Sequence, residues 1–331
     1  MESRFTQIWY SRTGLTQLLR PLSWLFCSVV FVRRWLYRLH LMRSTRLSVP
    51  VLVVGNLTVG GTGKTPMVVT LSNMLKQAGY RPGIISRGYG GKARTWPQQV
   101  RPDSDPAIVG DEPILIARRT RCPMAVGPDR VVAGEALLKY ADCDIIISDD
   151  GLQHYALKRD VEIIVVDGVR RFGNGFCLPA GPLREPVRRL ERADFVVTNG
   201  TALKHEYAMH YEGEVLINLK DKNRTCRLDS FKGKQVHAIA AIGHPQRFFA
   251  SLRKAGLKVE EHAFVDHHVF TPADLDYGED AVIIMTEKDA VKCQRFSTEH
   301  MWYLPVEAVL NNDFEMQLLN RIEKRYGQKS A

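Results

Sequence analysis

The stretch that decides the fold is VPVLVVGNLTVGGTGKT, residues 49–65. Its first half is a nearly continuous apolar run, as expected of a parallel strand that is covered on both faces. Its second half is a glycine-rich loop that ends in Lys-Thr, and the pattern after the loop predicts a helix over residues 64–77. A strand, a glycine-rich loop and a helix in this order predict a phosphate-binding loop, or P-loop.

The predicted P-loop binds polyphosphate through backbone N–H groups, which glycines allow to turn inward around the phosphate oxygens. In such a loop Lys64 would reach the β- and γ-phosphates, and the hydroxyl of Thr65 would ligate magnesium. The glycine that usually opens the motif is replaced here by Thr58. The alternative is a glycine-rich turn that merely opens a helix. The predicted nucleotide-binding residues are Thr58, Val59, Gly60, Gly61, Thr62, Gly63, Lys64 and Thr65.

Apolar runs and helical stretches alternate along the rest of the chain. This alternation predicts an α/β fold, in which the parallel sheet of a P-loop NTPase with right-handed crossovers is joined by a second, smaller α/β domain. We expect an N-terminal helical arm over 1–45, a P-loop domain over 46–228 and the smaller domain over 229–331. Further strands are predicted over 83–86, 124–126, 144–148, 162–166, 195–198, 235–242, 258–264 and 281–285, and helices over 112–119, 129–139, 245–255 and 312–325.

A P-loop usually needs an acid at the end of a neighbouring strand, which holds magnesium through its water shell. Two predicted strands supply candidates, one ending at Asp149 and Asp150 and the other ending at Asp167. We prefer the first pair because Gly-Leu-Gln-His follows it directly, which gathers several polar groups at one strand end. Asp167 is as well explained as a cap of the loop that follows it.

Other polar clusters fall in loops after strand ends, where ligands of open α/β sheets bind. Taken singly, each is explained by a turn or a helix cap. Arg184 can contact a phosphate or an acidic substrate group. Asp266, His267 and His268 could form half a metal site or a histidine general base oriented by a carboxylate. The clusters are SRGYGG (86–91), GDEP (110–113), GPLRE (181–185) and FVDHHVF (264–270).

The formal net charge of +10 is concentrated at the N-terminal end of the chain. Residues 1–50 hold eight arginines against Glu2, a charge of +7 that leaves +3 for all other residues. Nucleic-acid binding favours a basic patch with stacking aromatics, which this arm does not provide, so we expect no nucleic-acid partner. The six cysteines have neither a C-x-x-C pair nor metal-ligand spacing, which indicates ordinary thiols in a reducing compartment.

The N-terminal arm contains twelve uncharged residues, PLSWLFCSVVFV, over 21–32. This run is too short to cross a bilayer, which needs about 20 apolar residues. A signal peptide fits poorly because a long basic stretch follows. We expect a helix that begins near Pro21 and lies in an anionic cytoplasmic leaflet. The alternative is a surface helix whose apolar stripe packs on the body. The predicted stripe is Leu22, Leu25, Val29, Val32, Leu36 and Leu39.

Taken together, the motifs resemble the tetraacyldisaccharide 4′-kinases, which phosphorylate a lipid A precursor. The resemblance covers nearly the whole chain after residue 45, and the hydrophobic arm is similar to the membrane-associating helix of that family. The motifs that carry it follow in order: GNLTVGGTGKTP (55–66), SRGYGG (86–91), GDEP (110–113), SDDGLQH (148–154), GPLRE (181–185), FVDHH (264–268) and MTEKDAVK (285–292).

The resemblance implies a kinase that uses ATP and Mg²⁺ and phosphorylates the 4′-hydroxyl of a tetraacylated disaccharide 1-phosphate. It implies that Asp149 and Asp150 serve as magnesium and active-site acids, beside Lys64 and Thr65. It further implies an active site in a cleft between the two domains. The remaining roles that it implies are deprotonation of the acceptor by Asp111 paired with His267, with Asp266 nearby, and support of the site by Arg184 and His154.

The expected partners are the lipid-linked disaccharide and the membrane surface, with no protein partner required. The expected location is the cytoplasmic face of the bacterial inner membrane, where the protein would be peripheral or monotopic. The rival interpretation is a P-loop NTPase switch or metallochaperone that acts on a protein partner. We disfavour it because the sequence has neither an N-K-x-D motif nor a cysteine-rich metal-delivery motif.

Overall fold

The computed structural model describes residues 9–10 and 14–326. The P-loop strand lies in the interior of the larger of two sheets, and its neighbours on both sides are parallel to it. The strands of this first sheet are β1 (Val51–Gly55), β2 (Pro82–Ser86), β3 (Gln98–Val100), β4 (Met124–Val126), β5 (Ile145–Asp149), β6 (Val161–Asp167), β7 (Phe195–Asn199), β8 (Tyr207–Glu212) and β15 (Glu307–Leu310).

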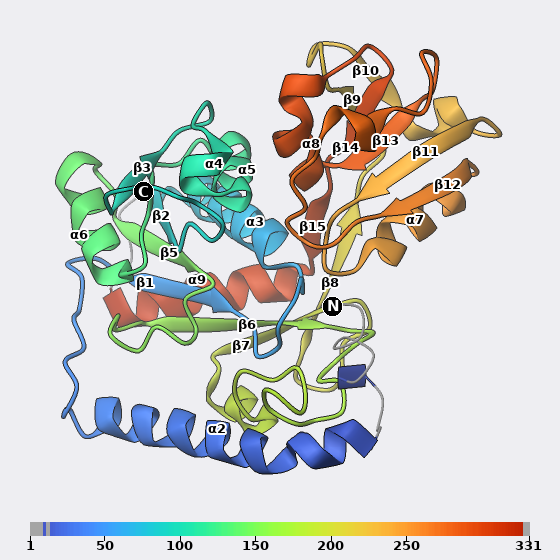
Figure 1. Ribbon diagram of the computed structural model, residues 1–331. Helices are drawn as coiled ribbons and strands as arrows, with labels where there is room; N and C mark the ends of the chain where they lie inside the picture. The colour runs from blue at the N-terminus through green and yellow to red at the C-terminus, as the bar shows by residue number, and fades with distance from the viewer. Residues whose placement is uncertain (1–8, 11–13, 327–331) are drawn as a thin grey trace.

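The first sheet has the order β15-β8-β7-β6-β1-β5-β2-β4-β3 (Figure 1). All pairs from β8 to β4 are parallel, and β15 and β3 add an antiparallel strand at each edge. The predicted parallel α/β sheet is therefore confirmed. The helices of the chain are α2 (Gly14–Arg38), α3 (Lys64–Gln77), α4 (Pro106–Val109), α5 (Asp111–Thr120), α6 (Arg130–Tyr140), α7 (Pro245–Lys254), α8 (Glu287–Cys293) and α9 (Asn312–Tyr326).

Helices cover both faces of the first sheet, which explains why its central strands are apolar without alternation. Successive side chains of a strand point to opposite faces. Leu52 and Val54 of β1 accordingly pack in one core with α3, α5 and α9. Val51 and Val53 pack in the other core with α6 and the α2 side chain of Phe26. Packing on both faces of the sheet fixes the position of β1, and with it the position where the P-loop begins.

The second sheet has the order β10-β9-β14-β13-β11-β12, and α7 and α8 pack on it. The chain then returns to the first sheet through β15 and α9, whose Phe314 is fully buried there. The division of the chain at residue 228 stays a prediction, while the strand pairings assign β9 and β10 to the second sheet. Its strands are β9 (Val215–Asn218), β10 (Thr225–Arg227), β11 (Gln235–Ala240), β12 (Lys258–Ala263), β13 (Ile283–Thr286) and β14 (Met301–Leu304).

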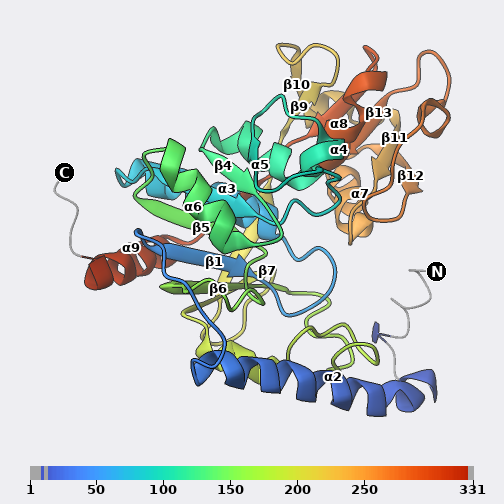
Figure 2. The same cartoon turned by 60° about the vertical axis from the view of Figure 1, so that its left-hand side comes forward.

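The N-terminal helix α2 begins earlier than the sequence predicted. It starts at Gly14 and contains Pro21 in its interior, whereas we expected the helix to begin near that proline. With 25 residues it is long and apolar enough to cross a membrane by length and composition. It runs along the bottom of the molecule, below the first sheet (Figures 1 and 2).

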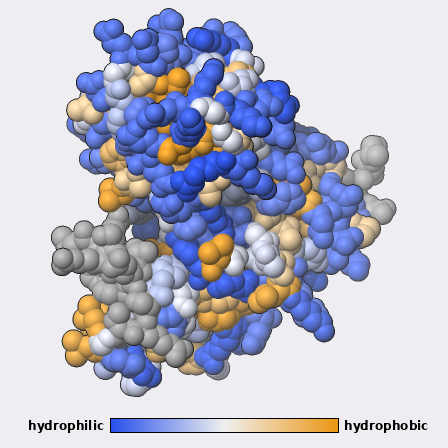
Figure 3. Space-filling view, turned by 90° about the vertical axis from the view of Figure 1, so that its right-hand side faces the viewer, coloured by the Kyte–Doolittle hydropathy of each residue, from blue (hydrophilic) through white to orange (hydrophobic). Residues whose placement is uncertain are grey.

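The predicted stripe of α2 faces away from the body. Leu22, Leu25 and Val29 are 52–63% exposed. The side that faces the body makes both apolar and polar contacts: Phe26 packs against the core, the hydroxyl of Ser23 donates to the carbonyl of Cys177 at 2.8 Å, and an Arg34 nitrogen lies 3.5 Å from a Glu185 oxygen. Figure 3 shows hydrophobic residues at the lower left and lower middle of this face of the molecule, among hydrophilic ones. The alternative, in which the stripe packs on the body, is wrong.

Candidate active site

The P-loop, residues 56–63, has free backbone donors. Gly60 and Gly63 have positive φ values of 99° and 104°, which turn the chain sharply before α3 begins at Lys64. Among the described residues, the N–H groups of Gly60, Gly61, Thr62 and Gly63 donate to no protein acceptor. Free N–H groups at the N-terminus of a helix form a site for an anion. The loop therefore offers donors of the kind that the predicted nucleotide-binding site needs, and the assignment of the nucleotide to it stays a prediction.

The first residues of the P-loop are engaged by the GPLRE segment. The N–H of Val59 donates to the carbonyl of Pro182 at 2.8 Å, and Thr58 forms a bridge with Leu183. The N–H of Arg184 donates to the carbonyl of Leu57 at 2.6 Å. These contacts hold the two segments together and leave the amides after Val59 to face a ligand. They also bring the side chain of Arg184 to the carboxyl end of β5.

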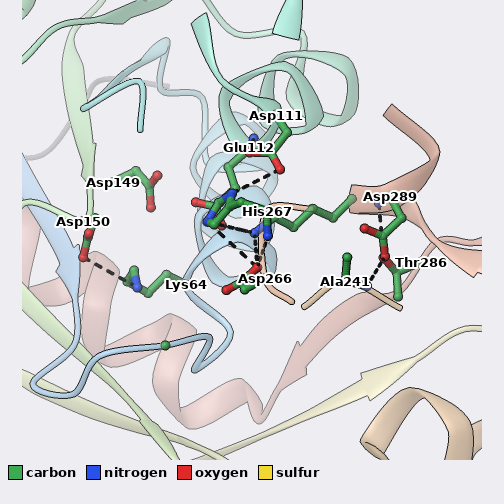
Figure 4. Close-up of polar contacts among 12 residues, drawn as sticks. Lys64, Asp111, Glu112, Asp149, Asp150, Ala241, Asp266, His267, Thr286 and Asp289 are labelled. Carbon is green, nitrogen blue, oxygen red and sulfur yellow. Dashed lines mark hydrogen bonds and ion pairs between the residues drawn. The ribbon is translucent and has the colours of Figure 1, made fainter. Parts of the chain in front are cut away.

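Asp150 forms ion pairs at the end of β5. Its Oδ1 lies 3.6 Å from Lys64 Nζ (Figure 4). The same oxygen lies 3.1 Å from Arg184 Nη1. Burial disfavours the charged carboxylate, but the charges of Lys64 and Arg184 outweigh it and lower the pKa of Asp150 to about 2. The backbone of Asp150 is left-handed, with φ of 47°, a conformation that non-glycine residues adopt mainly where surrounding contacts fix it.

Asp149 is the neighbouring acid, and no side chain in the described part of the chain forms an ion pair with it. It is 2% exposed, and its Oδ2 accepts a hydrogen bond from the Ser86 hydroxyl at 3.0 Å. Its Oδ1 is buried without a protein partner. Burial, followed by the charges of Glu112 and Asp150, raises its pKa to about 7. A buried carboxylate with one free oxygen beside a P-loop fits a magnesium ion, which prefers oxygen ligands.

A second group of charges joins the two sheets. Nδ1 of His267, which follows β12, lies 3.3 Å from Oδ2 of Asp111, the first residue of α5. This contact is the main cause that raises the pKa of His267. Burial opposes ionisation of Asp111, yet the hydrogen bond from His267 and the charge of Lys288 lower its pKa to about 2. The His267 ring also packs against Tyr89, with ring centroids 5.1 Å apart.

Lys288 of α8 was not singled out by the sequence analysis. Its Nζ lies 2.9 Å from Glu112 Oε1, 3.1 Å from Asp266 Oδ1 and 3.5 Å from His267 Nε2. Burial disfavours its charge, but the surrounding carboxylates, that of Glu112 first, raise its pKa. Lys288 belongs to the motif MTEKDAVK, which carries part of the family resemblance and could have marked it as a site residue. Its neighbours in the sequence do not indicate which acids it contacts.

Arg170 is another contact that the sequence analysis missed. Its guanidinium donates to the carbonyl of Gly61 in the P-loop and, at 2.9 Å, to the carbonyl of Gly243 after β11. It therefore ties the P-loop to the second sheet. The contact of Lys288 with Glu112 and that of Arg170 with Gly243 depend on the way the two sheets pack.

Three predicted polar residues lie outside these groups. Asp167 accepts from the N–H groups of Val169 and Arg170, so it caps the loop after β6 as its alternative interpretation proposed. His268 contacts Asp274 at 3.2 Å and stacks on Phe264, away from Asp111. His154 Nε2 accepts from the Arg130 N–H at 3.3 Å, and it reaches the site indirectly because Arg130 donates to the Asp150 carbonyl.

Residues 15–323 match the family described as tetraacyldisaccharide-1-P 4′-kinase. A tetraacyldisaccharide 4′-kinase of Nitrosococcus oceani is 52% identical over 328 residues, which cover 99% of this chain and 96% of the relative. One from Hahella chejuensis is 45% identical over 331 residues, covering 98% and 97%. The crystal structure of the "apo" form of LpxK from Aquifex aeolicus in complex with ATP has a TM-score of 0.77 at 30% identity, covering 93% of this chain and 99% of that one. The chain belongs to the tetraacyldisaccharide-1-P 4′-kinase family.

Proposed function

We propose that this protein transfers the γ-phosphate of ATP to the 4′-hydroxyl of a tetraacyldisaccharide 1-phosphate, with Mg²⁺, at a membrane surface. One observation carries the proposal: the P-loop, with its free amides and Lys64, lies in the same region as His267, whose ring contacts Asp111 of α5 (Figure 4). Phosphoryl transfer to an alcohol needs both parts, because one positions and neutralises the phosphates and the other accepts a proton.

The nucleotide would be bound by the amides of Gly60 to Gly63 and by Lys64. Thr65 and Asp149 would hold Mg²⁺, which neutralises charge on the transferring phosphoryl group when bound. We assign this role to Asp149 rather than to Asp150 because Asp149 has a free oxygen, whereas Asp150 is paired with two cations. Asp150 would position Lys64 and Arg184, and Arg184 would support the phosphates.

The acceptor hydroxyl would lose its proton to the Asp111–His267 pair. Asp111 contacts Nδ1 of His267, which orients the ring and stabilises the imidazolium that forms when Nε2 takes up a proton. Lys288 lies 3.5 Å from Nε2 and links it to Glu112 and Asp266. Because Asp111 belongs to the first sheet's helix α5 and His267 to the second sheet, the pair forms only when both units are in place.

The lipid acceptor explains the N-terminal helix. The outward face of α2 is apolar, while Ser23 and Arg34 fix its inner face to the body. These contacts hold the helix along the body, so we infer that it lies in the plane of the cytoplasmic leaflet as a peripheral or monotopic anchor. The basic charge of the arm adds attraction to anionic lipids. No protein partner is needed in this proposal.

The decisive experiment supplies labelled ATP to the purified protein with and without tetraacyldisaccharide 1-phosphate in detergent micelles. We expect label at the 4′ position and ATP consumption that depends on the lipid. Lys64→Ala should abolish transfer, whereas His267→Ala should abolish transfer and leave nucleotide binding intact. Rapid ATP hydrolysis without the lipid, or with a protein partner only, would instead support an NTPase switch or metallochaperone.

A further inference from the structure

A cluster of metal-binding side chains lies on the second sheet, outside the candidate active site. His237 Nδ1 and His262 Nε2 are 3.1 Å apart. Glu260 Oε2 lies 3.6 Å from the His237 nitrogen, and Glu260 Oε1 lies 3.7 Å from the His262 nitrogen. Among the described residues this is the one group of three such ligands whose atoms lie within 4.8 Å of one another.

The strand register explains how the cluster forms. β11 and β12 are parallel neighbours in which His237 is opposite Glu260 and Ile239 is opposite His262. Residues two apart on a strand point to the same face, so Glu260 and His262 both face the side chain of His237. Three ligands on two hydrogen-bonded strands form a rigid donor set.

The distances fit a tetrahedral ion. Zinc binds histidine nitrogen at about 2.0–2.1 Å and carboxylate oxygen at about 2.0–2.2 Å, so neighbouring ligand atoms of a tetrahedral site are roughly 3.3–3.5 Å apart. The observed separations of 3.1, 3.6 and 3.7 Å lie on both sides of that value. Small side-chain rotations would bring all three atoms to one ion. We propose that His237, Glu260 and His262 bind a divalent transition-metal ion such as Zn²⁺.

The surroundings suit such a site. Tyr277 packs against both rings, stacked on His237 with centroids 4.5 Å apart and tilted against His262 with centroids 4.3 Å apart, so the imidazoles are held in place. The two histidine side chains are only 17% and 19% exposed. Gln235 donates to Glu260 Oε2 at 3.3 Å, which orients the carboxylate as outer partners do in metal sites.

The location indicates a structural role. β12 is the edge strand of the second sheet and pairs only with β11. His237 lies near the start of β11, whereas the loop after the other end of that strand approaches the P-loop at Gly243. Because His262 is opposite Ile239, the cluster lies along the middle of the strand pair, where a metal ion would cross-link the edge strand to its neighbour. The carboxylate and two imidazoles leave a fourth position for water.

The test uses full-length protein that has been treated with chelator and then titrated with Co²⁺, whose visible absorption reports a tetrahedral environment. We expect one saturable ion per chain, displacement by Zn²⁺, and a higher melting temperature with Zn²⁺, because an ion that binds only the folded state stabilises it. His262→Gln and His237→Gln should each lose the Co²⁺ absorption and the zinc-dependent stabilisation, with kinase turnover unchanged.

The matched control is His210→Gln. The exposed side chain of His210 on β8 lies 3.0 Å from that of Glu212, so it has a carboxylate neighbour. No second histidine joins it in a metal-ligand group of the described chain. This variant should bind Co²⁺ like the wild type. The proposal is overturned if wild-type protein shows no saturable Co²⁺ absorption, or if His262→Gln and His237→Gln bind the ion as tightly as the control. Melting curves without metal show whether each variant is folded.

Discussion

Nδ1 of His267 lies 3.3 Å from Oδ2 of Asp111, and this contact joins the second sheet to the first. Asp111 is the first residue of α5, whereas His267 lies in a turn of the loop after β12 and has a left-handed backbone with φ of 61°. The contact therefore fixes the ring from two directions, and it makes the basicity of His267 depend on a carboxylate from another part of the chain.

Asp111→Asn should slow turnover and move its pH dependence. The contact with Asp111 raises the pKa of His267, so the variant should have a lower pKa at that histidine. The base acts unprotonated, so the acidic limb of the kcat/KM profile should shift to lower pH. Because the base is no longer oriented, the maximal value of kcat/KM at high pH should fall by about 100-fold or more. Asp103→Asn, at an exposed position earlier in the chain, should change neither quantity. An unshifted acidic limb in Asp111→Asn would remove the dyad from the mechanism.

Magnesium binding should depend on the protonation of Asp149. Its pKa is raised to about 7, so the carboxyl is mostly protonated at pH 6 and mostly charged at pH 8. We expect the Mg²⁺-dependent part of nucleotide affinity to be weaker at pH 6 than at pH 8. Asp149→Asn should bind Mg²⁺ weakly at both pH values. Asp142→Asn changes a carboxyl that is 82% exposed and should retain the wild-type behaviour. Equal Mg²⁺ affinity at the two pH values would contradict the assignment.

Asp149→Asn should also stabilise the ligand-free protein. A carboxyl whose pKa rises on folding costs stability once the pH passes its ordinary value, and the full cost is present above the folded pKa. The cost is roughly 1.4 kcal/mol for each pKa unit. The gain in melting temperature over the wild type should thus grow between pH 5 and pH 8, as measured by thermal unfolding at each pH. If the variant melts below the wild type at pH 8, the charged carboxylate of Asp149 stabilises the folded protein, and this prediction is wrong.

Gly63→Ala should destroy nucleotide binding. Gly63 has φ of 104°, and an added Cβ would lie 2.2 Å from the Tyr211 hydroxyl, so the loop must shift. The control is Gly79→Ala, just beyond the other end of α3, where φ is 83° and an added Cβ meets nothing within 4 Å. Both alanines carry backbone strain of about 1–2 kcal/mol. Only the first should lower ATP affinity more than tenfold in a calorimetric titration, and equal losses would argue against the P-loop as the binding site.

Replacing Leu22, Leu25 and Val29 together by serine should release the protein from anionic vesicles. These side chains face outward, and each contributes at most about 1.5–3 kcal/mol when it enters hydrocarbon. We expect vesicle affinity to fall at least 100-fold in flotation assays, with an unchanged melting temperature. A variant with serine at Val132 and Leu203, exposed apolar positions elsewhere, should float like the wild type. Undiminished flotation of the triple variant would exclude α2 as the anchor.

Local patterns in the sequence predicted the first strand, the loop after it and the helix at residues 64–77. The structure gives the helix the predicted bounds and a shorter strand, Val51–Gly55. These patterns succeed because hydrophobic periodicity, glycine conformation and helix termini act over a few residues. The same short-range reasoning placed Asp149 and Asp150 at a strand end. It was wrong at the start of α2: we predicted Pro21 near the first position of the helix, but the helix begins at Gly14 and Pro21 lies inside it.

Only the tertiary structure decided which of these groups meet. The periodicity of α2 defines an apolar stripe but not whether protein or membrane covers it; that depends on Ser23 and Arg34 finding partners on the body. In the same way, the sequence contains Lys288 and Glu112 far apart, and their 2.9 Å contact exists only because the second sheet packs against α5. Contacts between distant segments depend on the packing of whole elements, and no local propensity encodes that packing.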